Sequence, residues 1–398
     1  MKRFAITLLL SGLAAATHAQ EFTFGGYGTL GFANSDNRQA DYLVDAFKPN
    51  GPGYTRATSW DADTRLGVQG TAHFTPTISA VVQLISEQDS QDSYRPTLEW
   101  ANVKWQATPD LSLRVGRVVL PVFMATDSRR VGYANPWVRP PVEMYSLVPV
   151  THSDGVDVIW RSALGGATNT LQALAGRSEA KFPNSSGFDA GDVQARDLLT
   201  VNDTIEIGFL SVRAIYGQGR ITIDAFEPYF DAFRMFGPPG AAIAQRYNVQ
   251  DRKVEFVGLG ASYDPGQWFV MGEAAKFDTH SVIGAKKAWY LSGGYRFGKF
   301  TPYLTYAQIK ADSATTDPGL PVAFLPPEAQ PVALMLNALL NQQLNILPRQ
   351  KTASVGVRWD VMKNVAVKAQ YDQVDIDEGS TGTFGNIQPG FQPGGRVR

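Results

Sequence analysis

The sequence contains no cysteine, which excludes disulfide frameworks, thiolate zinc sites and cysteine nucleophiles. Basic and acidic residues nearly balance, with 36 Lys and Arg against 37 Asp and Glu, and the formal net charge of −1 argues against a nucleic-acid-binding domain. Past residue 16, no apolar run approaches the roughly 20 residues that a transmembrane helix needs. These features exclude a helical membrane protein but not a β-barrel, whose polar and apolar faces average to an unremarkable hydropathy.

The N-terminus has the features of an export signal. Basic residues at positions 2 and 3 precede an apolar segment at 4–16, and Thr17 and Ala19 supply small side chains at the −3 and −1 positions. This order is typical of a cleavable secretory signal. We therefore expect a signal peptide at residues 1–19 and an exported mature chain; the alternative is a buried N-terminal helix.

Apolar and polar residues alternate with a period of two through several segments. Leu66, Val68 and Phe74 share one parity. The polar residues Arg65 and Gln69 share the other. The same alternation recurs in three further segments, at 156–161, 289–297 and 353–359. A period of two is typical of a β-strand with one apolar and one polar face, so the sequence predicts an all-β fold.

The expected connections between these strands alternate between short turns and long irregular loops. Seven short turns are expected, at 75–77, 108–110, 164–166, 202–204, 264–266, 297–299 and 360–364. Eight longer segments separate them, at 34–59, 88–95, 119–152, 177–195, 217–251, 278–287, 312–350 and 376–396. This pattern gives fifteen strands and leads us to expect a sixteenth. Because outer-membrane barrels have short periplasmic turns and long external loops, we predict one transmembrane antiparallel β-barrel over residues 20–398.

Two segments have a distinctive order of residues: Phe22-Thr23-Phe24-Gly25-Gly26-Tyr27-Gly28 and Leu113-Arg114-Val115-Gly116-Arg117. Together with the loop pattern, they resemble the Gram-negative bacterial outer-membrane porins of about sixteen strands, and the resemblance covers nearly the whole mature chain. It implies an outer-membrane channel for passive diffusion of small hydrophilic solutes and ions. It also implies a homotrimer surrounded by outer-membrane lipids and lipopolysaccharide, without cofactor, metal or catalytic residue.

The C-terminal end departs from that family. Its members normally close the barrel with a final strand that ends in an aromatic residue. This chain stops at Gly394-Gly395-Arg396-Val397-Arg398, where such a strand should begin. We therefore expect the sequence to be truncated.

The resemblance also implies that the third long loop, about residues 119–153, folds inward and narrows the channel. Its candidate constriction residues are Asp127, Arg129, Arg130, Arg139 and Glu143. Fixed charges in a narrow, low-dielectric passage bias which ions enter. The alternative is that Arg129 and Arg130 pair with Asp127 or Glu143 and only hold the loop in place.

The polar parity of the predicted strands supplies the wall of the pore. Nine basic residues fall on it: Arg65, Lys104, Arg114, Arg161, Arg213, Lys253, Arg296, Arg358 and Lys368. Six acidic residues share it: Asp61, Asp63, Asp157, Glu255, Glu273 and Asp372. The excess of positive charge predicts a mild preference for anions. For most of these residues the alternative is a solvated inner face without selectivity.

Two other functions remain open. A substrate-selective channel would use loops 3, 5 and 7 as a binding surface, either through the aromatic residues of 224–236 or through Asn337, Asn341 and Asn345, which a helix would align. The alternatives are loop packing for the aromatic residues and a helix packed on the rim for the asparagines. An outer-membrane barrel enzyme such as a lipase needs a nucleophile next to a histidine on the lipid-exposed face, and His73 falls on the inner parity.

Overall fold

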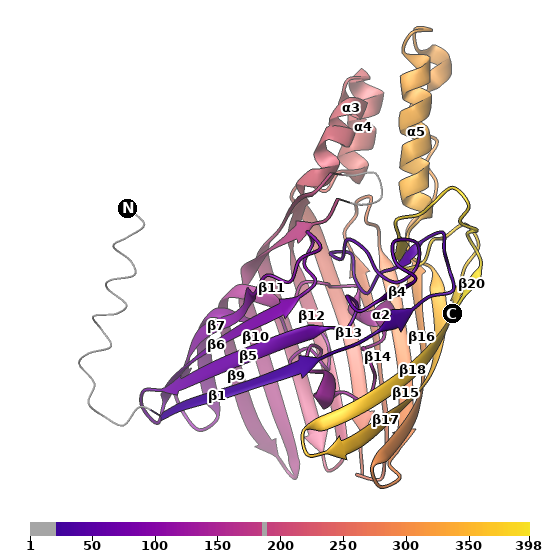
Figure 1. Cartoon of the computed structure of the whole chain (residues 1–398). Coiled ribbons are helices and arrows are strands. Elements are labelled where there is room, and N and C mark those ends of the chain that lie inside the picture. Colours follow the sequence, from indigo (N-terminus) through magenta and orange to yellow (C-terminus); the bar gives the residue numbers. More distant parts are fainter. Residues whose placement is uncertain (1–20, 185–188) are drawn as a thin grey trace.

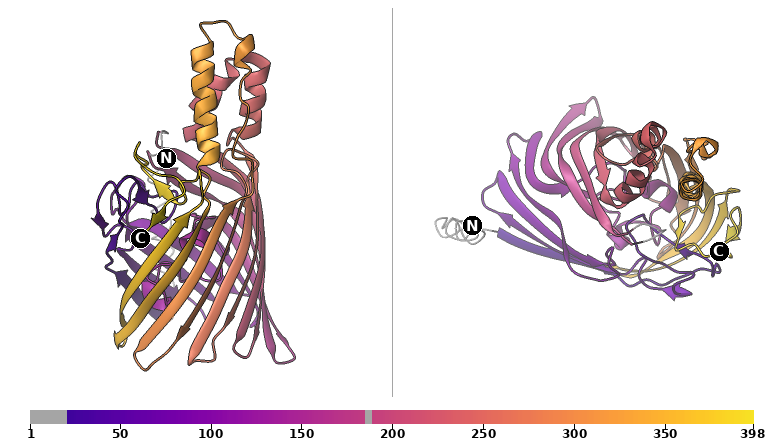
Figure 2. Two further views of the ribbon diagram at one scale, coloured as in Figure 1. Left: turned by 90° about the vertical axis from the view of Figure 1, so that its right-hand side faces the viewer. Right: turned by 90° about the horizontal axis from the view of Figure 1, so that it is seen from above.

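The computed structural model describes residues 21–184 and 189–398, so the expected signal peptide at 1–19 lies outside the described residues. A 16-stranded antiparallel sheet curves around a central interior (Figures 1 and 2), which confirms the predicted all-β fold. Its strands are β1 (Glu21–Thr29), β5 (Arg65–His73), β6 (Ile78–Glu87), β7 (Thr97–Gln106), β8 (Leu111–Val119), β9 (His152–Leu164), β10 (Ala167–Phe182), β11 (Gly191–Ile207), β12 (Leu210–Ile223), β13 (Arg252–Tyr263), β14 (Trp268–Asp278), β15 (Lys286–Tyr295), β16 (Phe300–Ala311), β17 (Gln350–Met362), β18 (Val365–Ile376) and β20 (Arg396–Val397).

The long loops contain short strands and helices. They are β2 (Ala33–Asn34), β3 (Asp41–Tyr42), β4 (Thr58–Ser59), β19 (Phe384–Gly385), η2 (Gly132–Ala134), η3 (Asp224–Phe226), η4 (Val322–Phe324) and α2 (Val142–Tyr145). The pairs β2–β4 and β3–β19 form two separate two-stranded sheets. The second of these pairs joins the first long loop to the last one.

The described strands do not close into a ring. β1 pairs with β5 on one side, and at the other end of the sheet β20 pairs with β18 over two residues. No pairing joins β1 to β18 among the described residues. The placement of β20 beside β18 agrees with the expectation that a final strand begins near Arg396.

The seven short turns and eight long loops alternate as predicted, and one turn lies elsewhere than expected. Residues 202–204 belong to β11, and the turn is formed by residues 208–209. Gly208 has φ +56°, which suits the first position of a two-residue hairpin turn. Asn202 and Thr204 are buried on the inner face. Asn and Thr are common in turns, which is why a turn was predicted here. In this strand they are present because the inner face of the sheet is polar.

Apolar side chains cover the outer face of the sheet. Leu304 is 66% exposed, and Val257 and Leu291 are more than half exposed. Their neighbours along each strand face inward and are buried or partly buried, as Glu273 and Ser292 are. A wall that is apolar outside and polar inside is the pattern of a membrane barrel. We call the two ends of this wall the short-turn end and the long-loop end.

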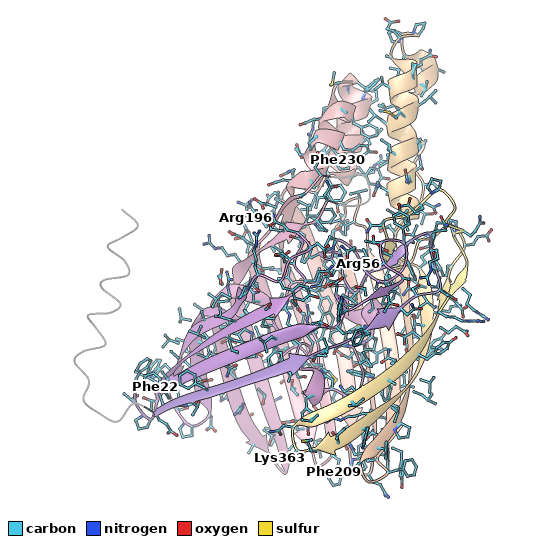
Figure 3. All side chains as sticks on the ribbon, viewed as in Figure 1. Phe22, Arg56, Arg196, Phe209, Phe230 and Lys363 are labelled. Atoms are coloured by element: carbon cyan, nitrogen blue, oxygen red, sulfur yellow. The ribbon has the colours of Figure 1, made fainter. Side chains whose placement is uncertain are left out.

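Helices from two long loops stand above the long-loop end (Figures 1 and 2). They are α3 (Glu227–Arg234) and α4 (Gly237–Tyr247) in the fifth long loop and α5 (Gln330–Asn345) in the seventh. Phe230, Phe233 and Leu340 are fully buried among them. Figure 3 shows Phe230 among these helices, and Phe209 at the short-turn end of the sheet. Within the described part of the chain, no helix combines the length and apolarity needed to cross a membrane.

Candidate functional site

Residues 120–151, which we call the inner loop, connect β8 and β9 and cross the interior. Their short helix α2 contacts β14, β15, β16 and β17. Trp137 and Met144 of the inner loop are 1% exposed and pack with Tyr290 and Tyr303 of the wall. Apolar burial of two large side chains gives the loop a fixed position against the far wall.

Polar contacts fix the inner loop at the same wall. The Trp137 indole donates to Ser292 Oγ at 2.8 Å. Glu273 of β14 accepts hydrogen bonds from the Tyr145 hydroxyl at 2.8 Å and from the backbone N–H of Met124 at 2.8 Å. These three contacts satisfy polar groups that are buried between the loop and the wall, and displacing the loop would leave them unsatisfied.

Basic residues of the wall donate to backbone carbonyls of the inner loop. Arg213 donates to the Phe123 carbonyl at 2.8 Å. Lys368 donates to the carbonyls of Asn135 at 2.6 Å and Trp137 at 2.7 Å. A carbonyl carries no net charge, so these contacts hold the loop without neutralising the cations.

Cavities lie on both sides of the inner loop. An outer cavity of about 1010 Å³ is bordered by loops of the long-loop end, including Asn50, Tyr229 and Gln342. A lower cavity of about 590 Å³ lies between the inner loop and residues near the short turns, such as Asp264. A much smaller pocket of about 80 Å³ lies where the inner loop meets the wall.

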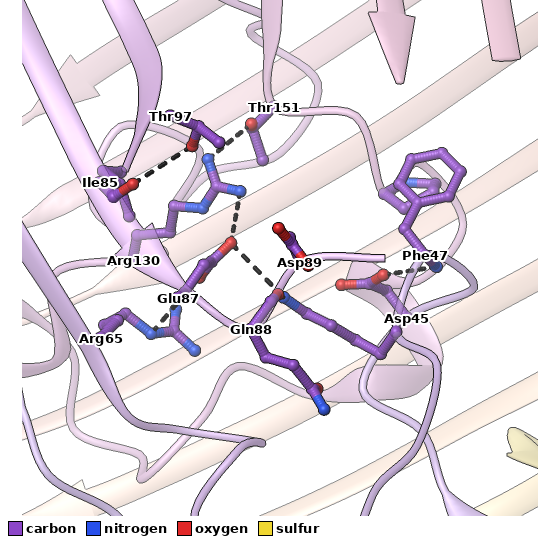
Figure 4. A network of polar contacts seen from close by, with 12 residues as sticks. Asp45, Phe47, Arg65, Ile85, Glu87, Gln88, Asp89, Thr97, Arg130 and Thr151 are labelled. Carbon is purple, nitrogen blue, oxygen red and sulfur yellow. Dashed lines mark hydrogen bonds and ion pairs between the residues drawn. The ribbon is translucent and has the colours of Figure 1, made fainter. Parts of the chain in front are cut away.

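Charged side chains gather around this small pocket. Arg130 binds Glu87 at 2.7 Å and also pairs with Glu99. Lys48 and Arg65 approach the Glu87 carboxylate at 3.6 Å and 3.8 Å (Figure 4). Burial lowers the pKa of Arg130, but the two carboxylates outweigh burial and raise it above its usual value. Arg130 therefore stays charged at the pocket.

Arg139 and Arg129 line the same pocket with different partners. Arg139 forms a two-point contact with Asp63, at 3.0 Å and 2.5 Å, and lies 3.7 Å from Asp372. Arg129 donates only to the carbonyls of Val148 and Pro149, at 3.3 Å and 2.8 Å, among the described residues. Burial, and then the charge of Arg130, lower the pKa of Arg129 to about 10, which leaves it positive at neutral pH.

The two acidic residues predicted for the constriction lie in different surroundings. Glu143 is 2% exposed and accepts hydrogen bonds from Gln350, at 2.5 Å, and from Thr352. Burial raises the pKa of Glu143 above its usual value. Asp127 is exposed on the inner loop. The alternative pairing of Arg129 or Arg130 with these two carboxylates is wrong, because Arg130 pairs with the wall.

Most of the predicted wall residues face the interior. Arg65, Lys104, Arg114, Arg161, Arg213 and Arg358 lie on the inner parity of their strands. Arg296 does not lie within a strand: it follows β15 and pairs with Asp264 at 2.7 Å in a neighbouring short turn. Lys253 and Glu255 share the outer parity with Val257, so their assignment to the inner wall is wrong. Both lie near the long-loop end of β13. At this end the outer face is no longer apolar, and polar residues can point outward.

Sequence reasoning missed Glu87 and Glu99, which pair with Arg130 of the inner loop, and Lys48, which lies beside Glu87. Glu99 sits at a β-bulge, because Trp100 pairs with Gln83 while Leu98 pairs with the next residue of β6. The extra residue turns the Glu99 carboxylate inward, which a strict period of two cannot predict. Glu87 continues the inner parity of β6 to its last residue, and extending that strand to its end would have found it.

Two of the three asparagines predicted for the seventh loop have a structural role, whereas Asn345 borders the outer cavity. Asn337 bonds both backbone groups of Leu320, at 2.7 Å and 3.0 Å. Asn341 does the same with Asp317, at 2.8 Å and 2.9 Å. The expectation of a helix here is correct, but Asn337 and Asn341 hold the neighbouring segment instead of facing a solute.

Comparison with known families decides between the barrel types. Residues 5–391 match the family model described as Gram-negative porin. The chain belongs to the Gram-negative porin family. This porin is therefore an outer-membrane β-barrel protein that forms a channel, and the family gives no support to the alternative of a barrel enzyme. Comparison with curated proteins gives no match.

Solved structures with similar folds come from several bacteria. The outer membrane channel DcaP of Acinetobacter baumannii shares 12% identity and has a TM-score of 0.50, with 94% of this chain and 95% of that chain covered. OmpF of Salmonella typhi, in complex with daunomycin, shares 12% identity over 92% and 94% of the two chains, with a TM-score of 0.47. The loop L8 deletion mutant of OmpT from Vibrio cholerae shares 12% identity over 92% and 96%, with a TM-score of 0.49. At this identity, the likeness to DcaP shows the shared fold.

Proposed function

We propose that this porin allows small hydrophilic solutes and ions to diffuse passively through a water-filled interior, with the inner loop as its narrowest part. The position of the inner loop between the outer and lower cavities carries the proposal. Charged side chains from the inner loop and the wall meet at the small pocket between them. Barrels of sixteen strands leave an aqueous channel, whereas those of about eight are filled by side chains.

A mild preference for anions follows from how the charges are paired. Arg129 and Arg213 bond neutral carbonyls of the inner loop, so no carboxylate neutralises their charges. Glu143 bonds neutral donors, and burial favours its protonated form because its pKa is raised. Most of the other acidic residues near the inner loop are bound to arginine. The balance near the inner loop is therefore positive.

Ion selectivity is measured from the reversal potential of the purified porin in a planar bilayer under a KCl gradient. We expect a potential whose sign shows that chloride permeates faster than potassium. A clear preference for potassium would overturn the anion preference while leaving the channel function intact. Absence of stepwise conductance would overturn the channel function itself.

The outer face supports two further parts of the proposal. Its exposed apolar residues would contact outer-membrane lipids and lipopolysaccharide, and part of this surface would pack against neighbouring barrels in a homotrimer. Cross-linking followed by mass measurement tests the assembly, and a mass of one subunit at high protein concentration would exclude the trimer.

A substrate-selective channel with a binding site in loops 3, 5 and 7 is the second candidate. It is favoured by an apolar cavity that these loops share with a single lysine. That cavity is separate from the charged pocket at Arg130.

A further inference from the structure

An apolar cavity of about 300 Å³ lies between the inner loop and the C-terminal end of α5. Its wall includes Leu120 and Val150 of the inner loop, Phe182 of β10 and Leu347 of the seventh loop. Almost all of its lining residues are apolar, and Lys286 is the single charged one among the described residues. Small-molecule sites in proteins commonly have this character, with mostly apolar walls and a few placed polar groups.

Lys286 is the first residue of β15, and its ammonium group has no partner in the described part of the chain. It lies on the inner parity of that strand with Ala288 and Tyr290. The backbone of Lys286 pairs with β14 and β16, but no hydrogen bond or ion pair joins its side chain to any residue that the structure describes. Its neighbour Lys287 faces outward and pairs with Asp312 at 2.9 Å. An ammonium group beside apolar surface without a counter-charge is costly, and an anion in the cavity would remove that cost.

The cavity adjoins the route that a solute would take from outside. Gln343 and Ile346 border both this cavity and the outer cavity of about 1010 Å³. The outer cavity is lined mainly by amides, aromatic rings and other uncharged groups, with Asp189 and Asp224 as its charged residues. A solute that enters the outer cavity is therefore next to the apolar cavity, whose far wall is formed by the inner loop.

We propose that this cavity binds small amphiphilic monoanions, namely aliphatic or aromatic monocarboxylates, during their passage through the channel. The carboxylate would pair with the Lys286 ammonium, and the hydrocarbon part would lie against the apolar side chains of the inner loop and β10. A neutral solute would leave the lysine unpaired, and a dicarboxylate would bring a second charge into apolar surroundings. The inference rests on the proposed channel function.

The apolar lining of the cavity also predicts how binding depends on the length of the carboxylate's hydrocarbon chain. Each methylene group that enters an apolar site strengthens binding by about fourfold. Affinity should therefore rise steeply from acetate through butyrate to hexanoate, and benzoate should bind much more tightly than acetate. A site that used charge alone would bind these anions equally.

The test measures how each carboxylate blocks the chloride current of the porin in a planar bilayer. Lys286→Gln should weaken block by hexanoate and benzoate at least about tenfold, because a hydrogen bond to a charged group is lost. Lys287→Gln is the matched control, since it removes a neighbouring lysine on the outer face, and it should leave block unchanged. Ala46→Leu keeps the charge but fills part of the cavity, so it should weaken hexanoate block without changing acetate block.

Calorimetric titration of benzoate into the folded protein in detergent gives a second readout that does not need conductance. Heat-modifiable migration on gels checks that each variant is folded. Two results would overturn the inference while leaving the channel function intact. One is block of equal strength by acetate and hexanoate, and the other is an equal weakening of hexanoate block in Lys286→Gln and Lys287→Gln. Benzoate binding without conductance would support the site and overturn the channel, and binding of neutral benzyl alcohol as tight as benzoate would show an apolar site without charge recognition.

Discussion

Replacement of Arg139 by glutamine removes the cation that holds the start of β5 to the inner loop. Asp63 is 2% exposed and receives both contacts from Arg139. The variant leaves this carboxylate buried without its main counter-charge. Breaking a buried ion pair in this way costs about 3–5 kcal/mol, so we expect the free energy of unfolding to fall by that amount at neutral pH.

The loss should depend on pH in a definite direction. Burial raises the pKa of Asp63, but the Arg139 charge outweighs burial and holds the pKa below its usual value of 3.8. In the native protein this carboxylate therefore stabilises the fold above about pH 4, and that stability is lost as the pH falls through the lowered pKa. In the variant, burial acts with less opposition and the pKa rises, so protonation relieves the penalty in acid. The difference between the two proteins should be largest near pH 7 and shrink towards pH 3.

Urea unfolding in lipid vesicles, followed by tryptophan fluorescence, gives the free energy at each pH. The double variant Asp63→Asn with Arg139→Gln is the control, because both groups are then neutral and much of the loss should be recovered. A variant as stable as the native protein within about 0.5 kcal/mol at pH 7 would refute the reasoning. So would a difference that grew in acid.

Other predictions concern the channel and its loops. Lys104→Gln with Arg161→Gln removes two inward cations of the wall, and the measured ratio of chloride to potassium permeability should fall; an unchanged reversal potential would contradict the charge argument. Asn337→Ala or Asn341→Ala should each cost about 1–3 kcal/mol locally and speed hydrogen exchange at the segment that the asparagine holds, without changing conductance. Trp137→Phe loses one buried hydrogen bond to the wall, so the inner loop should become more susceptible to protease, whereas protection equal to that of the native protein would show that apolar packing alone holds it.

Some features of the fold follow from local rules, and the exceptions have physical causes. The period of two placed Leu66 and Val68 on the outer face correctly. Successive side chains of a strand point to opposite faces, so the parity of a residue fixes the face on which it lies. The same rule failed at Glu99, where a bulge adds a residue, and for Lys253, which lies beyond the apolar band. Helices α3 and α4 were not predicted, because their apolar residues gain stability by packing against each other and in a buried cluster that includes α5, which is distant in the sequence.

The part of the wall that the inner loop contacts could have been predicted from the sequence, because its strands carry apolar residues on both faces. In β15, Trp289 and Leu291 face outward, yet the inward side carries Ala288 and Tyr290. Inward apolar residues also occur in β14 and β16, next to it in the sheet. A barrel full of water should not have an apolar inner face, so such a stretch indicates that protein covers it. The inner loop is what covers it here, which means that the two-sided apolar strands locate the constriction independently of its charges.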